Sequence, residues 1–239
     1  MKFFTPEVLY EIKNLKIYQN IKEYLPYLLM IIGIVFFQLF EVNVIDPPLT
    51  EWIQTDFAIT LQQIEGDFVF WFSQHWMPVI VYFFVFMYIV VYPFTLWFSL
   101  SYFLLTGKKK SIKAIAYGLL LIYVVVLPFY LFLPVTNVYT YYNVDSSLEA
   151  VIPTIEQFFY STTTKNNCLP SLHTAMTILV AWSFYLTKNK RLTYFAYFSM
   201  ISVIISVIYL AIHWVTDVLF GAILAIITIL ILRHFIKDE

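Results

Sequence analysis

Long apolar stretches constrain this chain more than any other feature. From Leu25 onward, runs of apolar residues alternate with short segments that collect most of the charges. A helix needs ~20 predominantly apolar residues to cross the hydrocarbon core of a bilayer. Charged residues make up only 12% of the chain, whereas soluble domains contain roughly 25%. The sequence therefore predicts an all-α, polytopic membrane protein.

Six crossings are expected from these runs, packed as a helix bundle. We place them at about residues 25–40, 77–105, 114–133, 170–188, 192–212 and 214–233. The first is slightly short for a straight crossing. The second is longer than needed, so we expect it to tilt or kink at Pro93. Residues 1–24 mix Lys with Glu and are interpreted as a cytoplasmic amphipathic leader, followed by a single membrane domain over 25–239. No cleavable signal peptide is evident.

The segment between the first two crossings, residues 41–76, predicts surface structure rather than a span. Asp46-Pro47-Pro48 predicts a turn, because proline fixes φ and disfavours helix in the residue before it. Beyond this turn, apolar residues recur every three or four positions, which indicates an amphipathic helix broken near Gly66. Three tryptophans are typical of a helix at the lipid–water boundary: Trp52, Trp71 and Trp76.

Basic residues predict the orientation of the bundle. With six crossings and a cytoplasmic N-terminus, all 14 Lys and Arg residues except Lys165 fall on the cytoplasmic side, as the positive-inside rule requires. Both termini are then cytoplasmic. The loop at 135–169, in which one short helix is expected from Pro153, lies on the extracytoplasmic side. The starts of the fourth and sixth crossings lie there too, and they carry the polar residues of most interest.

His213 and Asp217 form the first candidate motif. Four residues apart on a helix, they share one face. A carboxylate that accepts the Nδ1–H of the imidazole leaves Nε2 with a free lone pair, which suits a nucleophile or a base. A structural pair near the headgroups is the alternative reading. Ionisable residues in membrane segments favour the functional one, because burying them is costly.

Pro170-Ser171-Leu172-His173 forms the second motif, at the start of the fourth crossing. Proline is favoured at the first helical position, and the free N–H groups that follow make an anion site. Ser171 adds a hydroxyl donor, and protonated His173 adds a charge-assisted one. Taken alone, the motif reads equally as a capped helix start. Together with His213, Asp217 and nearby Lys165, it predicts a phosphoryl-transfer site.

The two motifs resemble signatures of the type 2 phosphatidic acid phosphatase (PAP2) superfamily. Pro170-Ser171-Leu172-His173 is similar to that family's Pro-Ser-Gly-His, and the run Ser206–Asp217 is similar to its Ser-Arg-x5-His-x3-Asp. Leu172, in place of Gly, and the run from His213 to Gly221 look closest to the branch of inositol phosphorylceramide synthase. The similarity covers most of residues 50–232.

This resemblance implies roles for the motif residues. His213 attacks phosphorus and becomes a transient phosphohistidine, Asp217 orients it, and His173 protonates the leaving oxygen. Ser171 and the backbone N–H of Leu172 hold the phosphate oxygens. No metal and no other cofactor is implied. The expected substrate is a phosphorylated lipid, and the expected surroundings are membrane lipids.

Two departures from the family pattern affect the phosphate site. Val207 stands where the family has Arg, and the family's upstream Lys motif has no match. The stretch Leu133–Tyr139 takes its place, where Asn137 and Tyr139 could donate hydrogen bonds and Lys165 could supply one cation. The departures leave the headgroup and the rate open.

Three functions remain to be separated. Water as acceptor gives a lipid-phosphate phosphatase, the preferred reading, and an alcohol as acceptor gives a phosphotransferase. A metal or proton transporter could use His213, Asp217, His173 and His75, but few polar residues continue toward the cytoplasmic side. The net charge of −1 argues against nucleic acid as a partner, and one cysteine, Cys168, excludes an internal disulfide. No obligate protein partner is evident.

Overall fold

A computed structural model describes residues 17–75 and 77–236, with side chains from Lys22 onward. Most of the expected leader, residues 1–16, and Trp76 lie outside the described residues. The regular structure within them is helical, with one isolated bridge between Val135 and Asn167. The elements in chain order are α2 (Ile17–Phe40), η1 (Glu41–Ile45), α3 (Asp46–Ile53), α4 (Ala58–Glu65), α5 (Phe68–Gln74), α6 (Pro78–Phe86), η2 (Met87–Val91), α7 (Tyr92–Leu105), α8 (Lys109–Phe132), α9 (Val138–Tyr141), α10 (Ser147–Val151), α11 (Ile155–Phe159), α12 (Leu172–Leu186), α13 (Lys190–Tyr209) and α14 (Val215–Ile236).

The predicted all-α membrane architecture is confirmed. Five helical runs of the described chain are long and apolar enough to cross a membrane: Lys22–Ile53, Pro78–Leu105, Lys109–Phe132, Lys190–Tyr209 and Val215–Ile236. The expected fourth crossing is the shorter α12, of 15 residues. At 1.5 Å per residue it is shorter than the hydrocarbon core. It packs against α8, α13 and α14, so five spans are established by length and a sixth is not.

The prediction of a turn at Asp46-Pro47-Pro48 is wrong. The first crossing continues through the prolines, because α2 passes into the π-helical turn η1 and then directly into α3. Proline inside an α-helix loses a hydrogen bond and clashes with the carbonyl four residues earlier. A π-helical turn widens the backbone at that point. The prolines then occupy the first turn of α3, where their missing N–H groups cost little.

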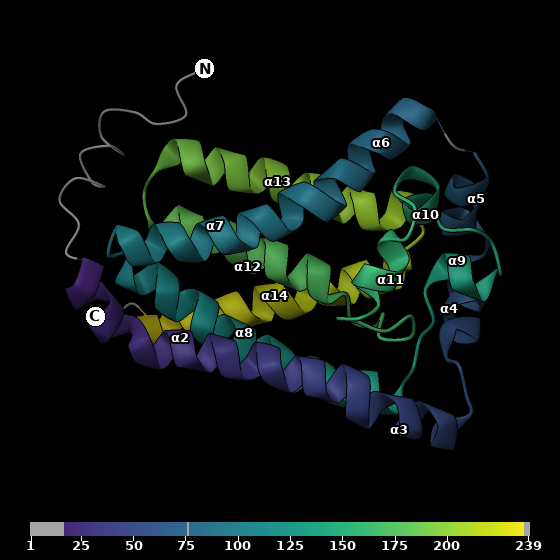
Figure 1. Ribbon diagram of the computed structural model, residues 1–239, viewed down its shortest axis with the longest axis horizontal. Helices are drawn as coiled ribbons and strands as arrows, with labels where there is room; N and C mark the ends of the chain where they lie inside the picture. The colour runs from purple at the N-terminus through teal and green to yellow at the C-terminus, as the bar shows by residue number, and fades with distance from the viewer. Residues whose placement is uncertain (1–16, 76, 237–239) are drawn as a thin grey trace.

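The second crossing also contains a π-helical turn, at the place where a kink was expected. The π-helical turn η2 ends two residues before Pro93, which lies in the first turn of α7. Figure 1 shows α6 inclined to α7 on either side of this turn. The turn carries Tyr88 toward the interior of the bundle, where its side chain is 2% exposed.

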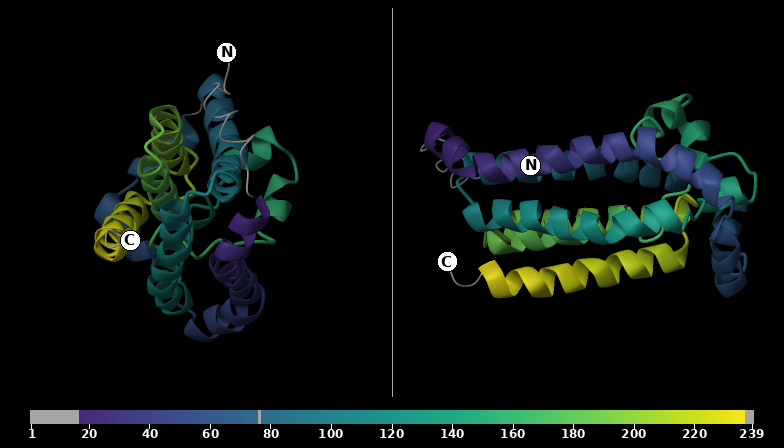
Figure 2. Two further views of the ribbon diagram at one scale, coloured as in Figure 1. Left: turned by 90° about the vertical axis from the view of Figure 1, so that its left-hand side faces the viewer. Right: turned by 90° about the horizontal axis from the view of Figure 1, so that it is seen from below.

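The segment expected to form one amphipathic helix forms α3, α4 and α5. A left-handed residue at Gln54 ends α3, and Gly66, with φ of 63°, ends α4 as expected. Figures 1 and 2 show α4 and α5 lying across one end of the bundle. Trp52 and Trp71 remain exposed there, at 76% and 54%, as expected of residues at the lipid–water boundary.

The long helices lie side by side and alternate in direction, so the described chain enters and leaves at the same end (Figure 1). The starts of α12 and α14 and the short helices α9–α11 lie at the opposite end. Large apolar side chains remain exposed along the outer faces of α2, α7, α13 and α14, as expected of helices that face lipid. The two buried motifs therefore share one end of a lipid-facing bundle.

Candidate active site

His213 lies in the turn between α13 and α14, and Asp217 lies in the first turn of α14. The Nδ1 atom of His213 is 3.3 Å from Oδ2 of Asp217, with the two side chains 4% and 0% exposed. The same Oδ2 accepts the backbone N–H of Trp214 at 2.9 Å. His213 precedes the helix, and its backbone N–H is held at 3.0 Å by the carbonyl of Val207. The expected pair therefore forms, anchored by backbone bonds on both sides.

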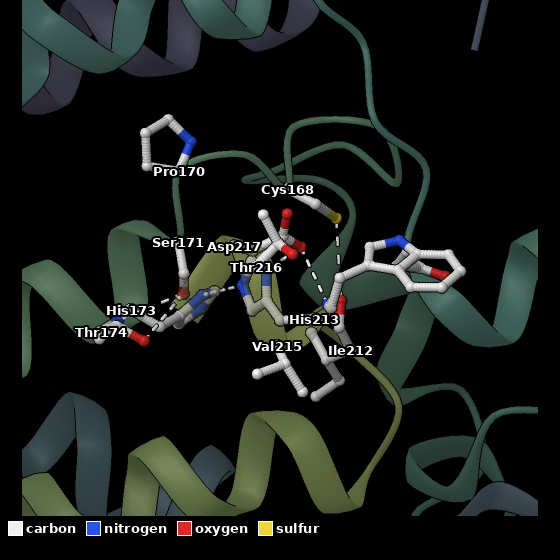
Figure 3. Close-up of polar contacts among 12 residues, drawn as sticks. Cys168, Pro170, Ser171, His173, Thr174, Ile212, His213, Val215, Thr216 and Asp217 are labelled. Atoms are coloured by element: carbon white, nitrogen blue, oxygen red, sulfur yellow. Dashed lines mark hydrogen bonds and ion pairs between the residues drawn. The ribbon is translucent and has the colours of Figure 1, made fainter. Parts of the chain in front are cut away.

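His173, from α12, contacts His213 directly (Figure 3). Its Nδ1 atom is 3.2 Å from Nε2 of His213, across 40 residues of sequence. The sequence predicted that these imidazoles would meet at one phosphate. The separation is too short for a phosphate group to lie between them. A phosphate could lie between the two rings only if they moved apart.

Tyr88 completes a line of polar contacts that the sequence did not predict. Its hydroxyl is 3.0 Å from Nε2 of His173. One set of donors satisfies the whole line: Tyr88 O–H donates to His173, His173 Nδ1–H to His213, and His213 Nδ1–H to Asp217. With this assignment both imidazoles are neutral, and burial lowers the pKa of His213 to about 3, which also favours its neutral form.

Aromatic rings surround His173 on several sides. Tyr88, Tyr92 and Phe159 have ring centroids 5.1, 5.2 and 6.3 Å from its imidazole. Tyr88 and Tyr92 are four residues apart, so their sequence spacing places them on one helix face. The four-residue spacing could have indicated that Tyr88 and Tyr92 share a face. Hydropathy alone does not show that this face lies against His173.

Ser171 and Leu172 begin α12 beside Asp217. Ser171 is the N-cap: its Oγ accepts the backbone N–H of Thr174 at 3.3 Å, and its own N–H donates to the carbonyl of Asp217 at 2.9 Å. A Cβ added at Gly221 would collide with the carbonyl oxygen of Ser171, so glycine there allows α14 and the start of α12 to approach. Ser171 is fully buried, whereas Leu172 lines a cavity of about 490 Å³, the main cavity described below.

Glu65, at the end of α4, holds the start of α14. Its two carboxylate oxygens accept the backbone N–H groups of Val215 at 2.9 Å and Thr216 at 2.6 Å. A carboxylate at a helix N-terminus satisfies free donors and complements the helix dipole. In the sequence, Glu65 is one of several polar residues that alternate with apolar ones in the segment expected to form the surface helix. The contact spans about 150 residues and no local pattern indicates it.

The remaining predicted phosphate ligands form a separate cluster. Lys165 lies 3.6 Å from Oε2 of Glu156 and stacks over the Tyr160 ring at 5.1 Å. Tyr139 contacts the hydroxyl of Tyr160, and the Asn137 amide donates to that hydroxyl at 3.1 Å. Lys165 and Tyr139 line a second cavity, of about 430 Å³. The structure does not bring these three residues together with the histidines, and their role as phosphate ligands stays a prediction.

The histidines open onto the main cavity, of about 490 Å³, between α2, α7, α8 and α12. Its walls are mostly apolar and include residues deep in the bundle, such as Leu96, Leu100 and Val180. A mostly apolar cavity lined by two imidazoles suits a ligand with a hydrocarbon chain and a polar head.

A metal site is a second chemical possibility at this position. Cys168, His213 and Asp217 offer ligand atoms within 4.8 Å of one another, and all three residues are buried. The Cys168 thiol faces the carbonyl of Ile212 at 3.7 Å (Figure 3). Burial raises the pKa of this thiol, and a bound metal would deprotonate it. Oδ2 of Asp217 also accepts the Trp214 N–H, and Nδ1 of His213 lies 3.3 Å from this Oδ2.

These features define a class: a polytopic membrane protein with a buried His–His–Asp line at one end of its bundle. Residues 140–239 match the family model of the PAP2 superfamily. This confirms the predicted resemblance for that part of the chain, which holds both histidines and Asp217. The searches of curated proteins and of solved structures found no match.

Proposed function

We propose that the protein is an integral membrane lipid-phosphate phosphatase that works through a phosphohistidine intermediate, without a metal, at the extracytoplasmic leaflet. The observation that carries this proposal is the line from His173 through His213 to Asp217 at the end of an apolar cavity. It supplies an acid, a nucleophile with a fixed tautomer, and an orienting carboxylate. The cavity accommodates lipid chains.

The first step forms a bond between Nε2 of His213 and phosphorus, and breaks the bond between phosphorus and the lipid oxygen. Asp217 stabilises the positive charge that develops on the ring. His173 moves away from His213 as the phosphate enters and takes up a proton from solvent, and the anionic phosphate stabilises the imidazolium that results. His173 then gives a proton to the leaving oxygen, and the lipid alcohol departs.

The second step frees the enzyme. A water molecule gives a proton to His173, its oxygen bonds to phosphorus, and the bond to His213 breaks. Ser171 and the N–H of Leu172 are the proposed holders of the phosphate oxygens at the start of α12. Lys165, Asn137 and Tyr139 lie near this end of the bundle and would reach the phosphate only after rearrangement of the loop.

A phosphotransferase is the alternative within the same chemistry, as the resemblance to the inositol phosphorylceramide synthase branch suggests. An alcohol would take the place of water in the second step. Added alcohols separate the two: a transferase forms a new phosphodiester in their presence, and a phosphatase continues to release inorganic phosphate.

Phosphoenzyme trapping tests the central proposal. The purified protein, quenched during turnover of a ³²P-labelled lipid phosphate, should carry an acid-labile, base-stable phosphate on His213. His213→Ala should lose both the label and turnover, by about a thousandfold or more. His234→Ala, at the far end of α14, serves as the control and should keep both. A His213→Ala protein with full turnover would falsify the assignment.

Chelators separate the enzyme from the metal-transporter alternative. We expect phosphate release to be unchanged after extended treatment with EDTA and after removal of the chelator. Loss of turnover that returns with Zn²⁺ would favour the Cys168–His213–Asp217 cluster as a metal site.

A further inference from the structure

Glu41 adds a carboxylate to the wall of the cavity that ends at the histidines. It lies on η1 and is 0% exposed, in a span where charged groups are costly. Its Oε2 accepts the Tyr123 hydroxyl at 3.3 Å, while its Oε1 has no hydrogen-bond partner among the described residues. Both Glu41 and His173 line the same cavity.

Asn167 is an independent second acceptor on this wall. It is 8% exposed, its Oδ1 has no hydrogen-bond partner within the described chain, and it lines the same cavity. Its amide lies beside the Glu41 carboxylate. Asn167 belongs to the loop that leads into Ser171 and His173, so the wall it forms with Glu41 adjoins the phosphoryl-transfer site.

The charge of this wall is not balanced by the protein. Asp46, 2% exposed, lies near Glu41 but does not line the cavity, and its Oδ1 accepts the Thr50 hydroxyl at 3.2 Å. Neither Lys nor Arg is among the described residues that line the cavity. Buried carboxylates are normally paired with a cation. Glu41 Oε1 and Asn167 Oδ1 are buried acceptors without a partner among the described residues, and both side chains line one cavity. Such acceptors suit an ammonium group with its three N–H donors.

We infer that Glu41 and Asn167 form a subsite for an ammonium group carried by the lipid phosphate substrate. The inference rests on the proposed function and extends it to substrate class. An ammonium group near a phosphate can belong to the lipid backbone, as in a sphingoid-base phosphate, or to the headgroup, as in an aminoethyl phosphodiester. Both place a positive charge within a few bonds of phosphorus.

Paired substrates test the subsite and distinguish the two sources. One pair is sphingosine phosphate and its N-acylated form, assayed by release of inorganic phosphate. The other is phosphatidylethanolamine and phosphatidylpropanol, an uncharged analogue of similar length, assayed by release of diacylglycerol. In at least one pair, the amine substrate should have a kcat/KM about tenfold higher or more, as expected for a hydrogen bond to a charged group.

Glu41→Gln should bring the ratio of kcat/KM within that pair close to one, because the amide keeps the shape and removes the charge. Asn167→Ala should reduce the same ratio by a smaller factor, which provides a second test if Glu41→Gln fails to fold. Glu51→Gln, an exposed carboxylate on α3, is the matched control and should leave the ratio unchanged.

Two results would overturn the inference while sparing the proposed function. One is turnover of phosphatidic acid by the wild type with no preference for the amine in either pair. The other is a Glu41→Gln protein with an undiminished preference, which would show that Glu41 is a protonated structural group. Absence of turnover on every lipid, phosphatidic acid included, would overturn the proposed function and the subsite with it.

Discussion

At the scale of single residues, the site is a line of hydrogen bonds in which each side chain donates to the next, from Tyr88 to Asp217. Tyr88, His173, His213 and Asp217 are joined by contacts of 3.0, 3.2 and 3.3 Å. In this arrangement the lone pair of the proposed nucleophile, His213 Nε2, is occupied by His173. The chain therefore describes a resting state, and substrate entry must exchange one imidazole contact for a phosphate.

Tyr88 is expected to hold His173 as it moves. We predict that Tyr88→Phe lowers kcat about fivefold, because losing a hydrogen bond worth about 1 kcal/mol leaves His173 less well positioned. The alkaline limb of the pH profile should also shift, since the hydroxyl contacts the ring that must be protonated to donate the proton. Steady-state kinetics from pH 5 to pH 9 measure both effects.

Tyr82→Phe is the matched control, since Tyr82 lies on α6 with its ring 60% exposed. It should leave kcat and the pH profile unchanged. A Tyr88→Phe enzyme that differs from wild type only in thermal stability would contradict a positioning role.

At the scale of elements, two π-helical turns position Glu41 and Tyr88, and one carboxylate positions the start of α14. The turn η1 carries Glu41 into the main cavity, and η2 carries Tyr88 toward His173. Such turns are frequent at functional sites, because they alter which side chains face inward. The surface helix α4 contributes Glu65, which fixes the first turn of α14.

Glu65→Ala should destabilise the protein by roughly 2 kcal/mol, because two charge-assisted bonds to the start of α14 are lost. In detergent, the midpoint of thermal unfolding should fall by about 5 °C. The value of kcat should fall as well, since Asp217 lies in that first helical turn. Glu65→Gln keeps one oxygen acceptor and should show a smaller loss of both.

Gln63→Ala, an exposed neighbour on α4, controls for changes to the helix itself. If it lowers stability as much as Glu65→Ala, then α4 as a whole, and not the carboxylate, is responsible.

At the scale of the whole molecule, the distribution of charge gives the bundle its proposed orientation. Basic residues gather at the end where α2 starts and α14 ends, near the α7–α8 and α12–α13 connections. Lys165 lies at the opposite end with the site. By the positive-inside rule, we propose that the basic end faces the cytoplasm and that the site faces outward.

Cysteine labelling in intact cells tests this orientation. Asp145→Cys, exposed in the loop near the site, should react with a membrane-impermeant maleimide. Lys190→Cys, at the start of α13, should react only after permeabilisation. The native Cys168 is 4% exposed and should stay unlabelled in both. The reverse pattern would place the site on the cytoplasmic side.

Local sequence properties determined much of this protein. Hydropathy and run length specified a membrane bundle, because the cost of an unsatisfied backbone in lipid leaves few alternatives. The His213–Asp217 pair could also be predicted, because a four-residue spacing brings side chains together near a helix start. The similarity of two short motifs was enough to indicate the family.

Only the tertiary structure decided which distant groups meet. Tyr88 reaches His173 across 85 residues and Glu65 reaches Val215 across 150, and both contacts depend on how each helix is rotated and packed. Lys165 pairs with Glu156 rather than joining the histidines. Pro47 and Pro48 continue a helix that their local preferences oppose, because a preceding π turn accommodates them. Periodicity describes one helix at a time, whereas a site is built where several helices converge.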